Sequence, residues 1–106
     1  MTPAQFEHLK STEEAFMLYF FNDTCGVCNV LWPKVSQVFE EEFPKIKVVK
    51  VFAPDSRELA GQLQMLSIPG IVVFFDGREY FRANGMISIA ELVGKVSRPY
   101  QMMFGE

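Results

Sequence analysis

The stretch FFNDTCGVCNVLWPK, residues 20–34, holds both cysteines of the chain. Two residues separate Cys25 from Cys28. The pair lies after a continuous apolar run over residues 15–21 and at the start of residues 25–43, in which apolar residues recur with helical spacing. This pattern predicts a strand buried on both faces, followed by a long helix. Cys25 then lies at the start of the helix, where free backbone N–H groups and the helix dipole favour a thiolate.

A thiolate at Cys25 would act as a nucleophile toward disulfides. A fall of the thiol pKa from ~8.5 toward 7 raises the thiolate fraction at neutral pH from a few per cent to about half. Cys28 shares the helical face one turn deeper, so it could attack a mixed disulfide at Cys25 and release the partner. Gly26 and Val27 carry no charge and present little bulk to an incoming disulfide. The spacing therefore predicts dithiol–disulfide exchange.

Other uses of the cysteine pair stay open at this point. A zinc site needs four ligands, and the only histidine, His8, lies on the first predicted helix, which disfavours a metal bound within one chain. A metal or cluster shared between two chains through Cys25 is one alternative. The other is that both cysteines are small buried hydrophobic residues.

The composition is that of a packed globular protein. The length of 106 residues predicts a single domain over residues 1–106, and hydrophobic residues make up 49% of it. The net charge of −3 gives no positive field to attract nucleic acid or an anionic membrane surface. No glycine-rich dinucleotide loop is present, so we expect no organic cofactor.

The N-terminal sequence MTPAQFEHLK has no basic segment followed by an apolar one, and no apolar run approaches the ~18 residues of a spanning helix. These features predict a cytoplasmic protein, unless a signal peptide has been removed. Two cysteines in a reducing compartment are more often catalytic or metal-binding than structural.

The remaining elements predict an α/β fold. A capping box at Thr2 and Gln5 starts a helix to about Lys10, and a second capping box, at Asp55 and Glu58, starts a helix. The apolar face of the helix that begins at Asp55 consists of Leu59, Leu63 and Leu66. Residues 46–52 read as a strand, and residues 71–83 as a hairpin with Asp76-Gly77 at its turn. We expect a small mixed sheet with helices on both faces, because a strand–helix–strand unit requires a parallel pair.

The C-terminal part begins with a helix capped by Ser88 and Glu91, and Pro99 is expected to stop it. The tail over residues 97–106 is unusually apolar. Its large apolar residues are Tyr100, Met102, Met103 and Phe104. Such a patch is costly to leave in water, so we expect the tail to pack back on the domain, with contact to a partner as the alternative.

The chain resembles the thioredoxin family over residues 15–96. The resemblance rests on C-G-x-C at a strand-to-helix junction, Ile68-Pro69 before a strand, Pro33 in the long helix and an Asn84-Gly85 turn. It implies the thioredoxin fold, with Cys25 as the attacking thiol and Cys28 as the resolving thiol. It also implies that Pro69 is a cis proline facing the cysteines, although most X-Pro bonds are trans. The backbone of Ile68 would pair with an extended substrate, and Gly85 would lie near the same groove.

The chain also departs from the family pattern. Thr24, Val27 and Asn29 replace the tryptophan, proline and lysine of the usual W-C-G-P-C-K. Tyr19 stands where the family keeps a buried aspartate, and Lys50 matches the lysine that usually partners this acid, unless it is simply a solvated strand residue. Without the carboxylate, deprotonation of Cys28 must rely on water or on the leaving thiolate, so we expect slow release of the mixed disulfide.

The sequence therefore predicts an enzyme that reduces protein disulfides through Cys25 and then Cys28. Its partners would be disulfide-containing proteins, and a separate reductase or a low-molecular-weight thiol would supply electrons. The alternatives are a binding module of the same fold with idle cysteines, and a dimer that bridges a metal cluster through Cys25.

Overall fold

The computed structural model describes residues 1–65 and 67–105. Along the chain the elements are α1 (Pro3–Thr12), β1 (Ala15–Phe21), α2 (Gly26–Glu42), β2 (Lys47–Phe52), the 3₁₀ helix η1 (Ala53–Asp55), α3 (Arg57–Gln62), β3 (Gly70–Phe75), β4 (Arg78–Asn84) and α4 (Ile89–Phe104). Within the described residues, no helix combines the length and apolar character needed to cross a bilayer.

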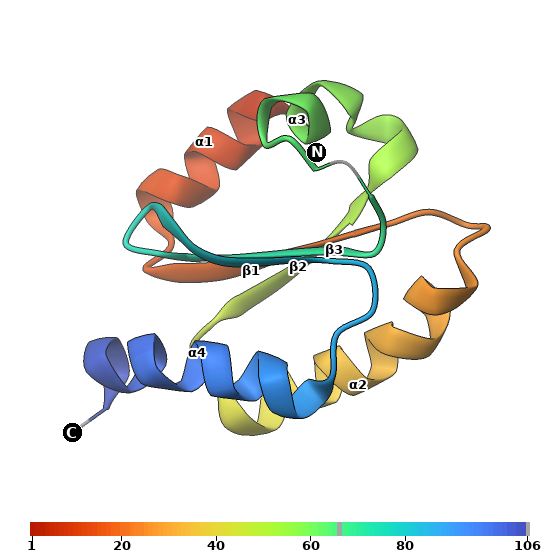
Figure 1. The fold of residues 1–106 in the computed structure, drawn as a ribbon. Coiled ribbons are helices and arrows are strands. Elements are labelled where there is room, and N and C mark those ends of the chain that lie inside the picture. The colour runs from red at the N-terminus through yellow and green to blue at the C-terminus, as the bar shows by residue number, and fades with distance from the viewer. Residues whose placement is uncertain (66, 106) are drawn as a thin grey trace.

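The strands form one four-stranded sheet in the order β2-β1-β3-β4. β1 runs parallel to β2 and antiparallel to β3, and β4 pairs antiparallel with β3. Helices α1 and α3 cover one face of this sheet, and α2 and α4 cover the other (Figure 1). The predicted mixed sheet with helices on both faces is confirmed.

The central strand β1 supplies the core on both sides, because successive side chains of a strand point to opposite faces. Phe16, Leu18 and Phe20 pack on the side of α1 and α3. Met17 and Tyr19 pack on the side of α2 and α4. All five are fully buried.

The hairpin between β3 and β4 forms as the sequence predicts. Asp76 and Gly77 have φ angles of 53° and 75°, the left-handed conformation that a two-residue hairpin turn requires at both positions. The capping box at the start of α1 is also present, because Thr2 Oγ1 accepts from the Gln5 N–H and the Gln5 side chain accepts from the Thr2 N–H.

The predicted capping box at Asp55 is wrong. Asp55 lies inside η1, and α3 begins after Ser56, whose side chain makes no capping bond. The buried Ser56 hydroxyl instead accepts a hydrogen bond of 2.7 Å from the Met1 amino group. Leu59 of the predicted helix face is buried, whereas Leu66 lies outside the described residues.

The prediction that Pro99 stops the last helix is also wrong, because α4 continues to Phe104. An interior proline removes one helical hydrogen bond, at a cost of about 3 kcal/mol. Packing after the proline offsets that cost: Tyr100 is buried with its ring 5.1 Å from that of Phe43, and its hydroxyl accepts from the Lys45 N–H at 3.3 Å. Most of the apolar tail thus packs on the domain, while Met102 stays 79% exposed.

Candidate active site

Cys25 occupies the N-cap position of α2. The loop before it is shaped by Asn22, whose side-chain oxygen accepts from the Thr24 N–H at 3.1 Å. The sulfur of Cys25 accepts from the backbone N–H of Cys28 at 3.0 Å, which is the bond that a capping serine or aspartate would make. The sulfur therefore lies at the positive end of the helix dipole, where the dipole and this donor would favour a thiolate once the sulfur is reduced.

The two cysteines form a disulfide and differ sharply in accessibility. Their Cα atoms are 5.2 Å apart. Cys25 is half-buried, whereas Cys28 is only 1% exposed. An incoming partner can therefore reach Cys25 but not Cys28.

Beneath the pair, Tyr19 is a neutral hydrogen-bond donor. Its hydroxyl donates to the backbone carbonyl of Cys28 at 3.0 Å, and its ring centroid lies 5.1 Å from that of Trp32. Burial raises the pKa of Tyr19 to about 12, so the phenol stays protonated at neutral pH. No carboxylate is buried among residues 1–65 and 67–105, where the one buried polar residue is Ser56. Within the described residues, Cys28 therefore has no buried carboxylate beside it to act as a base.

Lys50 lies beside Tyr19 on the neighbouring strand, because the two are register partners in the β1–β2 pair. Its side chain is exposed, and its ammonium group lies 4.4 Å from the ring centroid of Phe21 and 4.7 Å from that of Trp32. Such contacts hold a cation over aromatic faces. In the described residues the salt bridges lie elsewhere, so the contacts of Lys50 are aromatic rather than acidic.

The segments that carry Pro69 and Gly85 meet at the same end of the sheet. Gly70 pairs with Phe20 on one side and with Asn84 on the other, so Pro69 lies level with the end of β1, where the loop to Cys25 begins. The Ile68–Pro69 peptide bond is cis. The Gly85 N–H donates to the Pro69 carbonyl at 2.7 Å, and Gly85 has a φ of 80° that favours glycine.

Ile68 is half-buried and packs against both core clusters, one of which, on the side of α2 and α4, Cys25 also contacts. The structure thus joins Pro69 to Gly85 and places both on the cysteine end of the sheet. The predicted roles of Ile68, Pro69 and Gly85 in binding substrate stay predictions.

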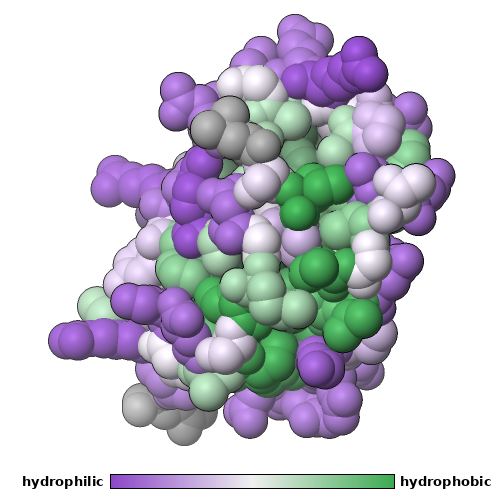
Figure 2. Space-filling model, turned by 45° about the vertical axis from the view of Figure 1, so that its right-hand side comes forward, coloured by the Kyte–Doolittle hydropathy of each residue, from purple (hydrophilic) through white to green (hydrophobic). Residues whose placement is uncertain are grey.

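Exposed apolar side chains occur in the segments around this site. Val27 and Val30, in the first turns of α2, are 42% and 56% exposed, and Met86, next to Gly85, is 63% exposed. Figure 2 looks toward the side of the molecule that carries the β1–α2 loop, and shows an apolar area in the middle of that face. The exposure of Val30 and Met86 could not be predicted from the sequence, because a single apolar residue outside the core pattern gives no signal of its own.

This arrangement can be compared with known proteins. A family model described as Thioredoxin matches residues 1–98. The chain belongs to the thioredoxin family. Family, fold and the bonded pair at the start of α2 together support a thiol–disulfide oxidoreductase.

Thioredoxin relatives match most of the chain. It is 30% identical over 89 residues to a thioredoxin-like protein, YdfQ, of Bacillus subtilis, a match that covers 84% of this chain and 79% of that protein. It is 32% identical over 82 residues to a thioredoxin of Chlamydia trachomatis, covering 77% and 79%. Among solved structures, the thioredoxin of Fasciola hepatica superposes with a TM-score of 0.80 at 26% identity, covering 92% of this chain and 93% of that one.

Proposed function

We propose that this thioredoxin reduces disulfide bonds in proteins, with Cys25 as the attacking thiol and Cys28 as the resolving thiol. One observation supports this assignment above the others. The Cys25 sulfur is partly exposed and accepts a backbone N–H at the start of α2, while Cys28 is buried behind it. The sulfur that a substrate can reach is the one whose anion the helix stabilises.

The reaction balances over two exchanges. In the reduced protein, the Cys25 thiolate attacks one sulfur of the substrate disulfide, so that a Cys25–substrate bond forms and the second substrate sulfur leaves as a thiolate, which takes up a proton from Cys28 or from water. The Cys28 thiolate then attacks the Cys25 sulfur, which forms the Cys25–Cys28 bond and releases the first substrate sulfur. The substrate gains two electrons and two protons, and the cysteine pair is oxidised. A separate reductase or a low-molecular-weight thiol returns it to the reduced state.

Substrate would dock as an extended segment across the cysteine end of the sheet. The backbone of Ile68, just before the cis proline, would pair with the substrate chain, with Pro69 and Gly85 forming the floor of the groove. Gly26 and Val27 would line the approach to the sulfur. The exposed apolar side chains of Val27, Val30 and Met86 would then favour substrates with apolar residues near the disulfide.

The proton on Cys28 has no buried carboxylate to receive it. Tyr19 is neutral and already donates its proton to the Cys28 carbonyl, so it cannot act as a base. Water or the leaving thiolate would accept the proton, and Lys50 would support this step only through its positive charge. We therefore expect release of the mixed disulfide to be slower than in thioredoxins that keep an acid at this position.

Turnover of a model protein disulfide with dithiothreitol as electron source tests the assignment. Wild type should turn over, Cys25→Ser should fall to the uncatalysed background, and Cys28→Ser should accumulate a mixed disulfide at Cys25. An inactive wild type whose Cys25 is alkylated like an ordinary thiol would favour the binding module. Colour or bound metal in the purified protein would favour the cluster-bridging dimer. Trapping with Cys28→Ser in a cell extract would identify the substrates. The cytoplasmic location of the protein stays a prediction.

A further inference from the structure

Helix α3 ends in a turn whose backbone is held by two hydrogen bonds. The Met65 N–H donates to the Ala60 carbonyl at 2.8 Å, and the Gln64 N–H donates to the Gly61 carbonyl at 3.1 Å. This is the Schellman arrangement, which places one residue in the left-handed conformation. Here that residue is Gln64, with a φ of 54°, rather than a glycine. Ile68 and Pro69 follow this turn along the chain.

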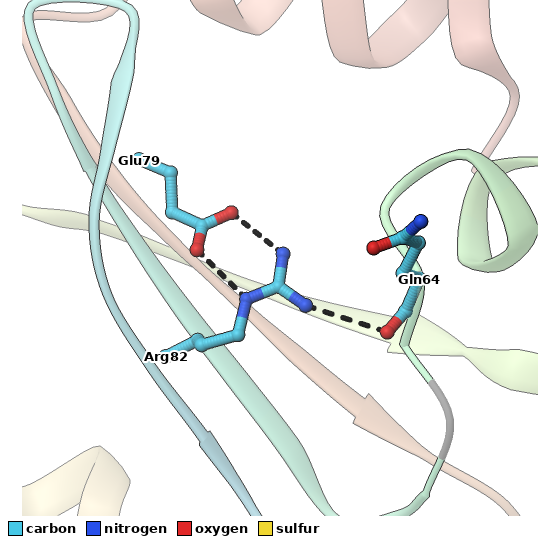
Figure 3. A network of polar contacts seen from close by, with 3 residues as sticks. All are labelled: Gln64, Glu79 and Arg82. Atoms are coloured by element: carbon cyan, nitrogen blue, oxygen red, sulfur yellow. Dashed lines mark hydrogen bonds and ion pairs between the residues drawn. The ribbon is translucent and has the colours of Figure 1, made fainter.

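Arg82 of β4 fixes the outside of this turn (Figure 3). Its Nε and one terminal nitrogen donate to the two carboxylate oxygens of Glu79, at 2.7 and 2.6 Å. Its other terminal nitrogen donates to the Gln64 carbonyl at 3.4 Å. The hydrogen bonds from Arg82 lower the pKa of Glu79, so the carboxylate stays charged and orients the guanidinium.

Two residues before the β3 strand are thus bonded to residues 82–85. The Gln64 carbonyl accepts from Arg82 of β4, and the Pro69 carbonyl accepts from Gly85, which follows β4 directly. Between these points, Met65 is buried against Gly70, where an added Cβ would collide with the Met65 side chain. Along the chain, Ile68 therefore lies between two residues that are bonded to residues 82–85.

We propose that Arg82 is a positioning residue for substrate docking. By holding Gln64, it keeps the backbone at Ile68 and Pro69 in place for pairing with an extended substrate. It touches neither the sulfurs nor the substrate, so it acts on docking and leaves the chemistry of Cys25 unchanged. The inference rests on the proposed reduction of protein disulfides, because only a substrate with a peptide chain uses this backbone.

The test compares a protein disulfide with a small aromatic disulfide that has no chain to dock. Arg82→Gln removes both the paired hydrogen bonds to the Glu79 carboxylate and the donor to the Gln64 carbonyl. Arg82→Lys keeps the positive charge but cannot form the paired hydrogen bonds. Both should raise KM for the protein substrate about three- to tenfold with little change in kcat. Glu79→Gln leaves the guanidinium without its charged partner and should raise KM by less. Reduction of the small disulfide and the alkylation rate of Cys25 should stay unchanged in all three.

Arg78→Gln is the matched control, because it removes the same charge from the hairpin end of β4, and it should match wild type. A wild-type KM for the protein substrate in Arg82→Gln or in Glu79→Gln would overturn the inference. An equal loss with both substrates would also overturn it, since that pattern means general destabilisation. A wild-type KM for the protein substrate in Arg82→Lys would show that the charge at this position is sufficient, and it would overturn the proposal that Arg82 positions the docking backbone. A wild type that reduces neither substrate would instead contradict the proposed function.

Discussion

The two faces of the sheet share strand β1 but differ in chemistry. Toward α1 and α3 the strand contributes Phe16, Leu18 and Phe20 to an apolar cluster, in which the Phe16 and Phe74 rings stack at 4.7 Å and Phe6 meets them edge-on. Toward α2 and α4 the same strand contributes Tyr19, whose hydroxyl contacts the Cys28 backbone. Alternate residues of β1 thus serve two purposes: those on one face pack an apolar core, and Tyr19 on the other face contacts the redox site. Substitutions on the two faces should show this separation.

The largest effect on folding is expected on the apolar face. Phe16→Ala removes a fully buried ring that packs against Phe6 and Phe74, so it should lower the free energy of unfolding by about 3–5 kcal/mol in urea titrations. Under conditions where the variant is folded, its Cys25 alkylation rate should equal that of wild type. An altered alkylation rate in the folded variant would show that the two faces of the sheet are coupled.

On the redox face we expect a smaller change in the free energy of unfolding, which occurs only at alkaline pH. The pKa of Tyr19 rises from 10.0 to about 12 on burial, so the fold favours the neutral phenol. The associated stability is present below pH 10 and is lost as pH rises through about 12, which amounts to roughly 2–3 kcal/mol. Unfolding of the oxidised protein, in which the cysteines do not titrate, should show this loss in wild type.

Tyr19→Phe should lack that alkaline loss, because it has no group to ionise. At neutral pH it should be about 1 kcal/mol less stable than wild type, since the bond to the Cys28 carbonyl is gone. Tyr80→Phe, at an exposed tyrosine, is the control and should follow wild type. Parallel pH profiles of wild type and Tyr19→Phe would show that burial of Tyr19 has no such linkage.

The smallest effect is expected at the edge of the redox face. Lys50→Gln removes the ammonium group from the faces of Phe21 and Trp32, which should cost about 0.5–1 kcal/mol in stability and alter the fluorescence of Trp32. Single-turnover kinetics provide the second measurement. A slower release of the mixed disulfide would support a role for the Lys50 charge in proton transfer. A release rate equal to that of wild type would leave Lys50 a structural cation.

The sequence predicts the parts of the fold that depend on local patterns. The apolar run of β1, the helical spacing of α2 and the Asp76-Gly77 turn each act over a few neighbouring residues, and all three appear where predicted. The start of α3 and the end of α4 depend on distant partners, the Met1 amino group for Ser56 and the Phe43 ring for Tyr100. Propensity rules applied to neighbouring residues cannot include such contacts.

The candidate site likewise contains features that local sequence motifs predict and contacts that they do not predict. The cysteine pair and Ile68-Pro69 are visible as motifs, because their geometry is set within a few residues. The contacts of Tyr19 with Cys28 and of Arg82 with Gln64 both end on backbone carbonyls. Every residue carries a carbonyl, so such an acceptor leaves no mark in the sequence. Only the three-dimensional arrangement reveals which carbonyl is used.

If the start of α2 acidifies the sulfur of Cys25, the alkylation of this sulfur should depend on pH accordingly. In the reduced Cys28→Ser variant the pH profile of alkylation follows a single thiol. We expect its half-maximal rate at a pH clearly below the ~8.5 of an ordinary thiol. A profile centred at or above that value would show that the helix does not acidify Cys25.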